Sequence, residues 1–208
     1  MGRRKKKRRG GADIELHLRR VEIALAYDGP LRGAPEPVLL FGVYRVADTD
    51  VTLLSRRAIA LRVGSGVPET IEIEDGHLGV HIPSSQARRM LVLAIALEED
   101  GGEGVRRMYA ELEAPPSLEA WAVDAVMPRP LSLLEWARQE PPPAPATTRV
   151  HLVDTHGDLR DQKLGDDWIG AAIVHVPPQR GRRSERRLRF ASEDGKNDWT
   201  AVLEVRRV

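Results

Sequence analysis

Residues 13–27 read Asp13-Ile-Glu-Leu-His-Leu-Arg-Arg-Val-Glu-Ile-Ala-Leu-Ala-Tyr27 and alternate polar with apolar side chains over most of their length. Successive side chains of a β-strand point to opposite faces of the sheet, so the apolar residues from Ile14 to Leu18 would share one face. After Arg19-Arg20 the alternation resumes at Val21, one residue out of phase. Such a slip predicts a β-bulge or a break between two strands.

The same strand-like pattern recurs through much of the chain. We expect further strands at Val38–Val46, Val51–Val63, Thr70–Ile82 with a turn near Asp75-Gly76, Met90–Leu97, Arg149–Val153, Trp168–Val176, Arg187–Ala191 and Trp199–Arg206. Met90–Leu97 is apolar on both faces, which predicts a central strand. Between these strands, helical signals occur at Val105–Glu113, at Leu118–Val126 and at the capping box Ser132-Leu-Leu-Glu135.

The order of these elements predicts one domain. The strands after residue 148 span only about 60 residues, which is a marginal size for an independent core. We therefore expect an all-β fold, in which residues 13–208 form one antiparallel β-sandwich of about eight strands with a helical and proline-rich insertion at about 104–147. Residues 1–12 are predicted to be a disordered polybasic tail, because adjacent like charges repel one another and bury nothing.

The net charge of +1 over 208 residues conceals two basic segments. The first is a run of seven cations: Arg3, Arg4, Lys5, Lys6, Lys7, Arg8 and Arg9. Without this run, the chain has 25 basic and 31 acidic residues and a net charge of −6. The second segment contains Arg180, Arg182, Arg183, Arg186, Arg187 and Arg189. Because each cation near an anionic leaflet contributes about 1 kcal/mol, both segments predict association with an anionic surface.

Several classes of function find no support in the sequence. The chain has no cysteine, which excludes disulfides, thiolate metal sites and a cysteine nucleophile. No apolar run approaches the roughly 18 residues of a membrane-spanning helix, and the N-terminal region lacks the apolar core of a signal peptide. Motifs for serine hydrolases, zinc proteases and nucleotide-binding loops are missing. We expect a non-enzymatic protein of the cytoplasm, located there or at the periphery of the membrane.

One loop concentrates acidic residues. Between positions 154 and 167, five of 14 residues are aspartates, namely Asp154, Asp158, Asp161, Asp166 and Asp167. Carboxylates on one loop suit calcium, which takes about 6–8 oxygen ligands. An EF-hand is excluded because Leu159 occupies the position that requires glycine. The alternative is a solvated turn in which the aspartates cap backbone groups.

Two motifs of the sequence resemble the calcium loops of C2 domains, which are β-sandwiches that bind calcium and membrane lipid. The motifs are Asp154-Thr155-His156 with Asp167-Trp168-Ile169-Gly170, which resemble the third loop, and Asp28 with Pro35-Glu36-Pro37-Val38, which resemble the first. The resemblance implies Asp154 and Asp167 as principal calcium ligands, supplemented by Asp158, Asp161, Asp166 and Asp28. However, His156 and Glu36 replace aspartates of the family pattern. The calcium-independent members, which use a basic surface, are therefore an alternative.

Together, these features predict a recruitment module for anionic membrane surfaces, with calcium as its candidate cofactor. A second reading is a protein–protein scaffold in which Trp121 and Trp136 of the insertion anchor a partner, and the basic segments would favour an acidic one. A third reading is nonspecific nucleic-acid association through the tail. The tail also fits a solubilising arm with no partner.

Overall fold

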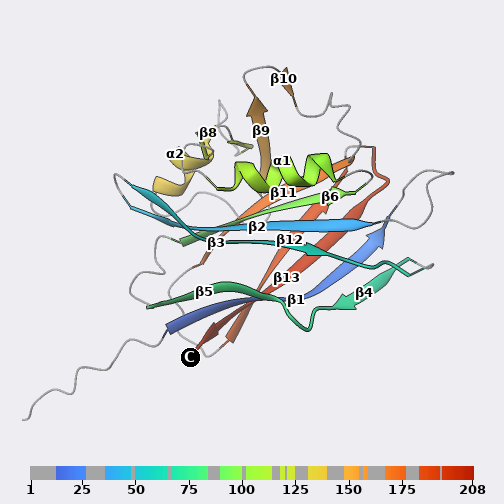
Figure 1. Cartoon of the computed structure of the whole chain (residues 1–208), viewed down its shortest axis with the longest axis horizontal. Helices are drawn as coiled ribbons and strands as arrows, with labels where there is room; N and C mark the ends of the chain where they lie inside the picture. Colours follow the sequence, from blue (N-terminus) through green and yellow to red (C-terminus); the bar gives the residue numbers. More distant parts are fainter. Residues whose placement is uncertain are drawn as a thin grey trace, which may run out of the picture.

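The computed structural model describes residues 13–26, 36–47, 50–64, 67–83, 90–99, 102–113, 118–119, 121–124, 131–139, 148–154, 157–158, 167–176, 183–192 and 194–208. These residues form two packed antiparallel β-sheets, as Figure 1 shows. The predicted all-β sandwich is therefore confirmed. The described part of the chain contains nine strands of seven or more residues, whereas the sequence predicted about eight.

The first sheet has five strands and contains both ends of the described chain. Its order is β12 (Arg183–Ala191), β13 (Asp198–Arg207), β1 (Asp13–Leu25) and β4 (Glu69–Glu72), and β5 (His77–Pro83) also pairs with β1. The β1–β13 register shifts between Leu18 and Arg20, which confirms the predicted bulge. The bulge is filled by the turn between β4 and β5, where the Leu18 N–H donates to the Gly76 carbonyl over 2.7 Å.

The second sheet has eight strands. Its order is β3 (Val51–Ala60), β2 (Pro37–Val46), β6 (Met90–Glu98), β11 (Asp167–Val176), β9 (Thr148–Asp154), β7 (Trp121–Asp124) and β8 (Leu131–Ser132), and β10 (Gly157–Asp158) pairs with β9. All nine residues of β6 are buried, as expected for a central strand. The predicted strand at Arg187–Ala191 is longer than expected and begins at Arg183.

The main core lies between the two sheets. The alternating apolar residues of β1 from Ile14 to Ile23 are 0–1% exposed, and so are Trp199, Ala201, Leu203 and Val205 of β13. They pack against the inner face of the large sheet, which contributes Phe41 among others. The period-two pattern of the sequence thus sets one apolar face of the small sheet toward this core and leaves the polar face outward.

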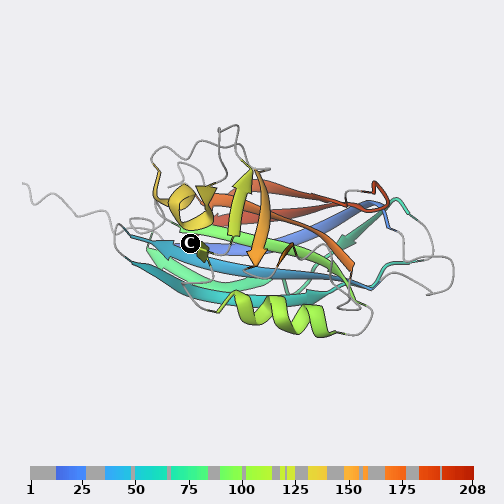
Figure 2. The same ribbon diagram turned by 90° about the horizontal axis from the view of Figure 1, so that it is seen from above.

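A second core covers the outer face of the large sheet. It is built by α1 (Glu103–Glu111), α2 (Leu133–Arg138) and β7, which pack on strands β2, β6 and β11. Figure 2 shows α1 running along the strands of this sheet. Trp121 and Trp136 are 0% and 2% exposed, so both tryptophans pack between the insertion and the sheet. They are therefore not surface anchors in this conformation.

The insertion corrects one prediction and confirms another. The helix expected at Leu118–Val126 is wrong, because Trp121–Asp124 forms β7 and pairs with β9 through Trp121 and Leu152. Its aromatic and β-branched residues gain a ladder partner that was not apparent from local helix signals. The capping box is confirmed: Ser132 caps α2, and the side chains and backbone N–H groups of Ser132 and Glu135 bond reciprocally. The insertion is therefore a mixed unit that extends the large sheet.

Strand directions define two ends of the sandwich. Asp13 and Val208 exchange backbone hydrogen bonds of 3.2 and 2.9 Å, and Arg206 lies opposite Arg183 in the adjacent ladder. We call this the basic end, because the polybasic segment joins the described chain at Asp13. The other end, where β2 begins, β6 ends at Glu98 and β11 begins at Asp167, is the acidic end. The ten residues of β11 span about 30 Å between the two ends.

Candidate functional site

The residues predicted to bind calcium are only partly covered by the structure. Asp28, Asp161 and Asp166 lie outside the described residues. The backbones of Asp154, Asp158 and Asp167 are described as strand positions in β9, β10 and β11. Among the side chains that are described, no group of three or more His, Asp or Glu residues is arranged to hold a metal ion. Calcium binding by these aspartates stays a prediction.

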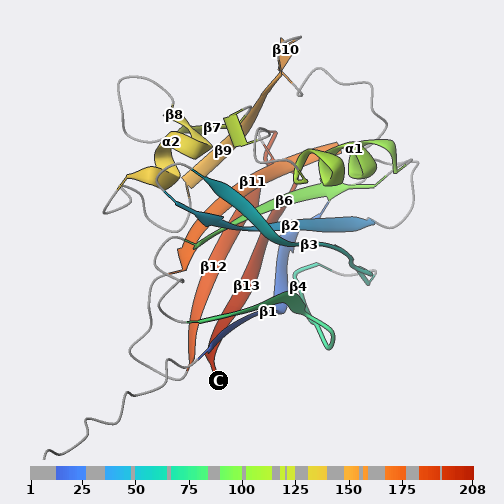
Figure 3. The same ribbon diagram turned by 60° about the vertical axis from the view of Figure 1, so that its left-hand side comes forward.

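The backbone separates the two principal aspartates of that prediction. Strands β9 and β11 pair only at Arg149 with Ala172 and at Thr148 with Ile173. Continued to the ends of the strands, this register would bring Asp154 opposite Asp167. Instead β9 separates from β11 while it remains paired with β7, and it continues toward β10, where Asp154 pairs with Gly157, as Figure 3 shows. The described backbone therefore does not place the two aspartates in one ladder.

The acidic end contains a buried carboxylate that the sequence analysis did not single out. Glu98 is 1% exposed, and its Oε1 accepts the Glu36 N–H over 2.9 Å. In the ladders on its two sides, Glu98 lies opposite Pro37 and Asp167. The register thus brings the start of β2, which follows the predicted first loop, and the start of β11, which follows the aspartate loop, to the two sides of one glutamate.

The predicted arginine cluster is divided by the strand pattern of β12. Arg180 and Arg182 lie outside the described residues, as does the whole run from Arg3 to Arg9. Arg183, Arg187 and Arg189 lie on the outward face of β12, whereas Arg186 lies on the opposite face and donates from Nη1 to the Glu185 carbonyl over 2.9 Å. The cluster is therefore not one continuous basic surface.

Two of the outward arginines form bidentate ion pairs with carboxylates. Arg189 binds Asp198 through Nε at 2.9 Å and Nη2 at 2.7 Å, and this pair raises the pKa of Arg189. Arg187 binds Glu22 through both terminal nitrogens. The hydrogen bond from Arg187 is the main cause of the lowered pKa of Glu22. These two contacts are bidentate, which is the stronger geometry for an arginine–carboxylate pair.

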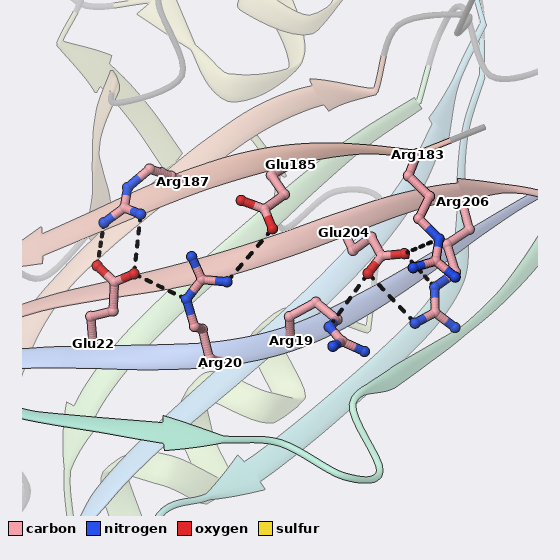
Figure 4. Close-up of polar contacts among 8 residues, drawn as sticks. All are labelled: Arg19, Arg20, Glu22, Arg183, Glu185, Arg187, Glu204 and Arg206. Atoms are coloured by element: carbon pink, nitrogen blue, oxygen red, sulfur yellow. Dashed lines mark hydrogen bonds and ion pairs between the residues drawn. The ribbon is translucent and has the colours of Figure 1, made fainter. Parts of the chain in front are cut away.

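Glu204 is the centre of a larger group of arginines, which Figure 4 shows. Arg206 donates from Nε to its Oε1 over 2.5 Å, and the Nε atoms of Arg183 and Arg19 lie 3.4 Å from Oε1 and Oε2. The arginines come from three adjacent strands: β13, β12 and β1. Burial raises the pKa of Glu204, but the hydrogen bond and charge of Arg206 and the charges of Arg183 and Arg19 outweigh this effect and lower it.

The bulge in β1 explains why two consecutive arginines reach this polar face. The extra residue lets Arg19 and Arg20 both lie outside the core between the buried Leu18 and Val21. Arg19 approaches Glu204, whereas Arg20 binds Glu22 through Nε at 3.1 Å and lies 3.6 Å from Glu185, as Figure 4 shows. A regular strand would direct one of the two side chains into the apolar core.

Histidines and carboxylates form a neighbouring cluster where β1 meets β5. The two ring nitrogens of His81 lie 2.6 Å from Asp13 and 3.5 Å from Glu15. His17 lies 3.4 Å from the second oxygen of Glu15, and its ring is 4.9 Å from that of His77. The hydrogen bond from His17 is the main cause of the lowered pKa of Glu15. These contacts couple the edge strand β5 to β1 electrostatically.

Comparisons with models of known protein families, with curated proteins and with solved structures find no match for this chain. The resemblance to C2 domains therefore stays an interpretation of the two short motifs. None of the described helices is both long enough and apolar enough to cross a bilayer.

Arg19, Arg206 and Glu204 form a polar site that was not predicted from the sequence. A signal was available, since Glu204 and Arg206 occupy alternating positions of a predicted strand and therefore share a face. Which strands would lie beside that face depended on the order β12–β13–β1, and local pattern does not reveal strand order.

Proposed function

We propose that this chain is a non-enzymatic recruitment module that binds anionic membrane surfaces through the basic end of its sandwich. One observation carries the proposal. The polybasic segment joins the fold at Asp13, which pairs with Val208, beside the Arg183–Arg206 pair. The basic segments at residues 3–9 and 180–189 thus join the fold at the same end, although they lie far apart in the sequence.

The cations of the tail supply enough binding free energy to hold the protein at an anionic membrane. The tail alone contributes seven cations, and each cation near an anionic leaflet is worth about 1 kcal/mol. Arg187 and Arg189 contribute less than the sequence analysis expected, because Glu22 and Asp198 neutralise them. The proposal therefore assigns the attraction to the tail and to the start of β12, and not to the whole length of β12.

Binding to vesicles tests the proposal. The full chain should sediment with vesicles that contain phosphatidylserine and not with neutral phosphatidylcholine vesicles. Deletion of residues 1–10, or replacement of the seven cations by glutamine at unchanged length, should abolish most of the binding. Added salt should weaken the binding of the full chain, because it screens exposed charges beyond about 10 Å at 0.1 M. Full binding by both tail variants would overturn the proposal.

The same variants separate the two alternative functions. Nucleic-acid association would show steep salt dependence and equal affinity for unrelated sequences. The affinity for nucleic acid would also exceed the affinity for vesicles at the same salt concentration. A protein scaffold would bind its partner without the tail. The burial of Trp121 and Trp136 removes the two anchors that the sequence analysis suggested for such a scaffold.

We further propose calcium control at the acidic end, a second candidate favoured by the position of Glu98 between the strands that follow both acidic motifs. Asp154 and Asp167 would be the principal ligands. Calcium, which supplies positive charge among repelling carboxylates, should raise the thermal unfolding temperature. The double variant Asp154→Asn and Asp167→Asn should lose that increase, whereas Asp75→Asn, in the β4–β5 turn, should retain it. No increase in the unmodified protein would eliminate calcium control and leave the basic-end proposal intact.

A further inference from the structure

The arginines around Glu204 carry more positive charge than the carboxylates beside them can neutralise. The five arginines of Figure 4 outnumber the carboxylates that act on them, which are the three glutamates of the figure and Glu15 beside Arg206. Arg20 and Arg187 are matched by Glu22 and Glu185. The excess therefore belongs to Arg19, Arg183 and Arg206, which share the single carboxylate of Glu204.

These three arginines retain hydrogen-bond donors directed away from Glu204. A guanidinium has five N–H donors, and the ion pairs of Arg19 and Arg183 with Glu204 have Nε at 3.4 Å from a carboxylate oxygen. Among the described residues, the side chains of Arg19 and Arg183 have no hydrogen-bond or ion-pair partner besides Glu204. Their side chains are 43% and 70% exposed, so an anion from solution can reach them.

Glu204 contacts all three arginines but does not occupy the outer side of the group. Its side chain is 7% exposed, below the exposed arginine heads. In Figure 4 the guanidinium groups of Arg183 and Arg206 lie together on one side of Glu204, and Arg19 approaches from another side. Like charges held this close repel, and an added anion would relieve that repulsion.

The surroundings limit the charge and the size of the ligand. His17 lies opposite Glu204 in the β1–β13 ladder, and Glu15 lies opposite Arg206. Glu185 lies opposite Glu204 on the β12 side. The carboxylates of Glu15 and Glu185 lie on two sides of the excess positive charge and limit its extent. The site therefore suits one compact anionic group and not a long run of negative charges along the face.

We propose that Arg19, Arg183 and Arg206 form a binding site for a phosphomonoester group. Such a group carries about −1.5 to −2 charges at pH 7 and three strong acceptor oxygens, which match the excess charge and the unused guanidinium donors. The site rests on and deepens the proposed recruitment function, since it adds a specific anion site to the nonspecific attraction of the tail. The phosphate group belongs either to a lipid headgroup or to a soluble molecule.

Titration of the full chain with sodium phosphate tests the site. Affinity would be measured by calorimetry and by the rise in unfolding temperature, against sodium chloride of equal ionic strength. The double variant Arg19→Gln and Arg183→Gln should bind about a hundredfold more weakly, because each of the two lost charge-assisted hydrogen bonds costs roughly a factor of ten. The control Arg57→Gln with Arg62→Gln removes the same charge from β3 and the residues after it. It should change the affinity by less than about twofold.

The variant Glu204→Gln separates binding from a structural role. It removes the only carboxylate that the three arginines share and frees their donors, so phosphate should bind more tightly than to the unmodified chain. A role of the arginines in stability alone predicts no such gain. Unchanged affinity in Arg19→Gln/Arg183→Gln, an equal loss in the control, or weaker binding by Glu204→Gln would each overturn the proposal.

A vesicle experiment distinguishes the two sources of phosphate and the two proposals. Phosphatidic acid presents a phosphomonoester, whereas phosphatidylserine does not. A lipid source predicts that Arg19→Gln/Arg183→Gln selectively weakens binding to phosphatidic acid vesicles, while deletion of residues 1–10 weakens binding to both lipids. Loss of phosphate binding in solution with unchanged vesicle binding assigns the site to a soluble phosphomonoester. A tail deletion without effect, alongside an arginine effect, overturns the recruitment mechanism and supports the site.

Discussion

The buried hydroxyl of Tyr44 donates a hydrogen bond to the carbonyl of Leu112 over 2.8 Å, which ties strand β2 to the residue after helix α1. Burial raises the pKa of Tyr44, so the phenol keeps its proton and remains the donor at all ordinary pH values. The bond satisfies one of the carbonyls that a helix end leaves without a partner. It fixes the place of the insertion on the outer face of the large sheet.

We predict that Tyr44→Phe lowers the free energy of unfolding by about 1–2 kcal/mol, because the Leu112 carbonyl would lose its partner inside the second core. Urea unfolding followed by circular dichroism would measure the change. The matched control is Tyr109→Phe, whose hydroxyl makes a longer contact of 3.4 Å with the Arg56 carbonyl at a half-buried position. Equal losses in the two variants would contradict the importance of the buried bond.

The substitution Gly76→Ala should destabilise the small sheet strongly. A Cβ atom at Gly76 would lie 1.8 Å from the Leu18 carbonyl oxygen, which is backbone and cannot rotate away. The turn that fills the β1 bulge would have to move, and we expect a loss of about 3 kcal/mol in unfolding free energy. Gly64→Ala is the control, since its Cβ would approach only the flexible Glu69 carboxylate at 3.4 Å. It should change stability by less than about 1 kcal/mol.

His175 should make the fold sensitive to mild acid. Its ring packs on Trp136 with centroids 4.7 Å apart, and burial lowers its pKa. The folded state therefore binds a proton less readily than the unfolded state. The stability that His175 contributes is complete above the ordinary histidine pKa of about 6.5 and is lost as the pH falls below it, by at most about 1.4 kcal/mol per pH unit.

The test of this pH effect compares the unmodified protein with His175→Phe, which keeps a ring against Trp136. Unfolding free energies at pH 7.5 and pH 5.5 should differ more in the unmodified protein than in the variant. The comparison cancels any contribution of the other five histidines, which both proteins retain. The same pH dependence in both proteins would show that His175 is not responsible.

Glu204 should also lose its contribution to stability in acid, but at a lower pH than His175. Its lowered pKa means that its contribution is present above the ordinary glutamate pKa and is lost as the pH falls through the folded value. We expect Glu204→Gln to cost about 1 kcal/mol at pH 7 in phosphate-free buffer. The difference between the two proteins should shrink as the pH falls below about 4.5. A difference that persists at pH 3 would assign the loss to packing and not to charge.

Much of the fold was predictable from local pattern. Strands such as Met90–Glu98 and Asp198–Arg207 were expected within one residue at either end, because burial of one or both faces imposes a visible alternation or an apolar run. The bulge near Arg19 was also expected, since a one-residue slip changes which side chains face the core. The helix expected at Leu118–Val126 failed, because the β9 partner of Trp121 lies 31 residues away from it in sequence.

For the candidate sites, the local concentrations of charge were predictable from the sequence, but the contacts between strands were not. The sequence identified the basic segments and the aspartate loop, since charge density is a local property. It did not show that Glu22 and Asp198 neutralise Arg187 and Arg189. Asp198 lies on the strand next to Arg189 and Glu22 lies two strands away from Arg187, and the alternation does not encode this strand order. The sequence also gave no sign that β9 separates from β11 before Asp154 reaches Asp167.

By itself, the amino-acid sequence determined the β-rich character of this protein, the bulge in its first strand, the capped helix at Ser132 and the two concentrations of charge. Each of these follows from interactions between residues close together in the chain. Only the tertiary structure decided that the basic segments join the fold at one end and that three arginines share Glu204. Those outcomes depend on which strands pair, and strand pairing is selected by burial over the whole core.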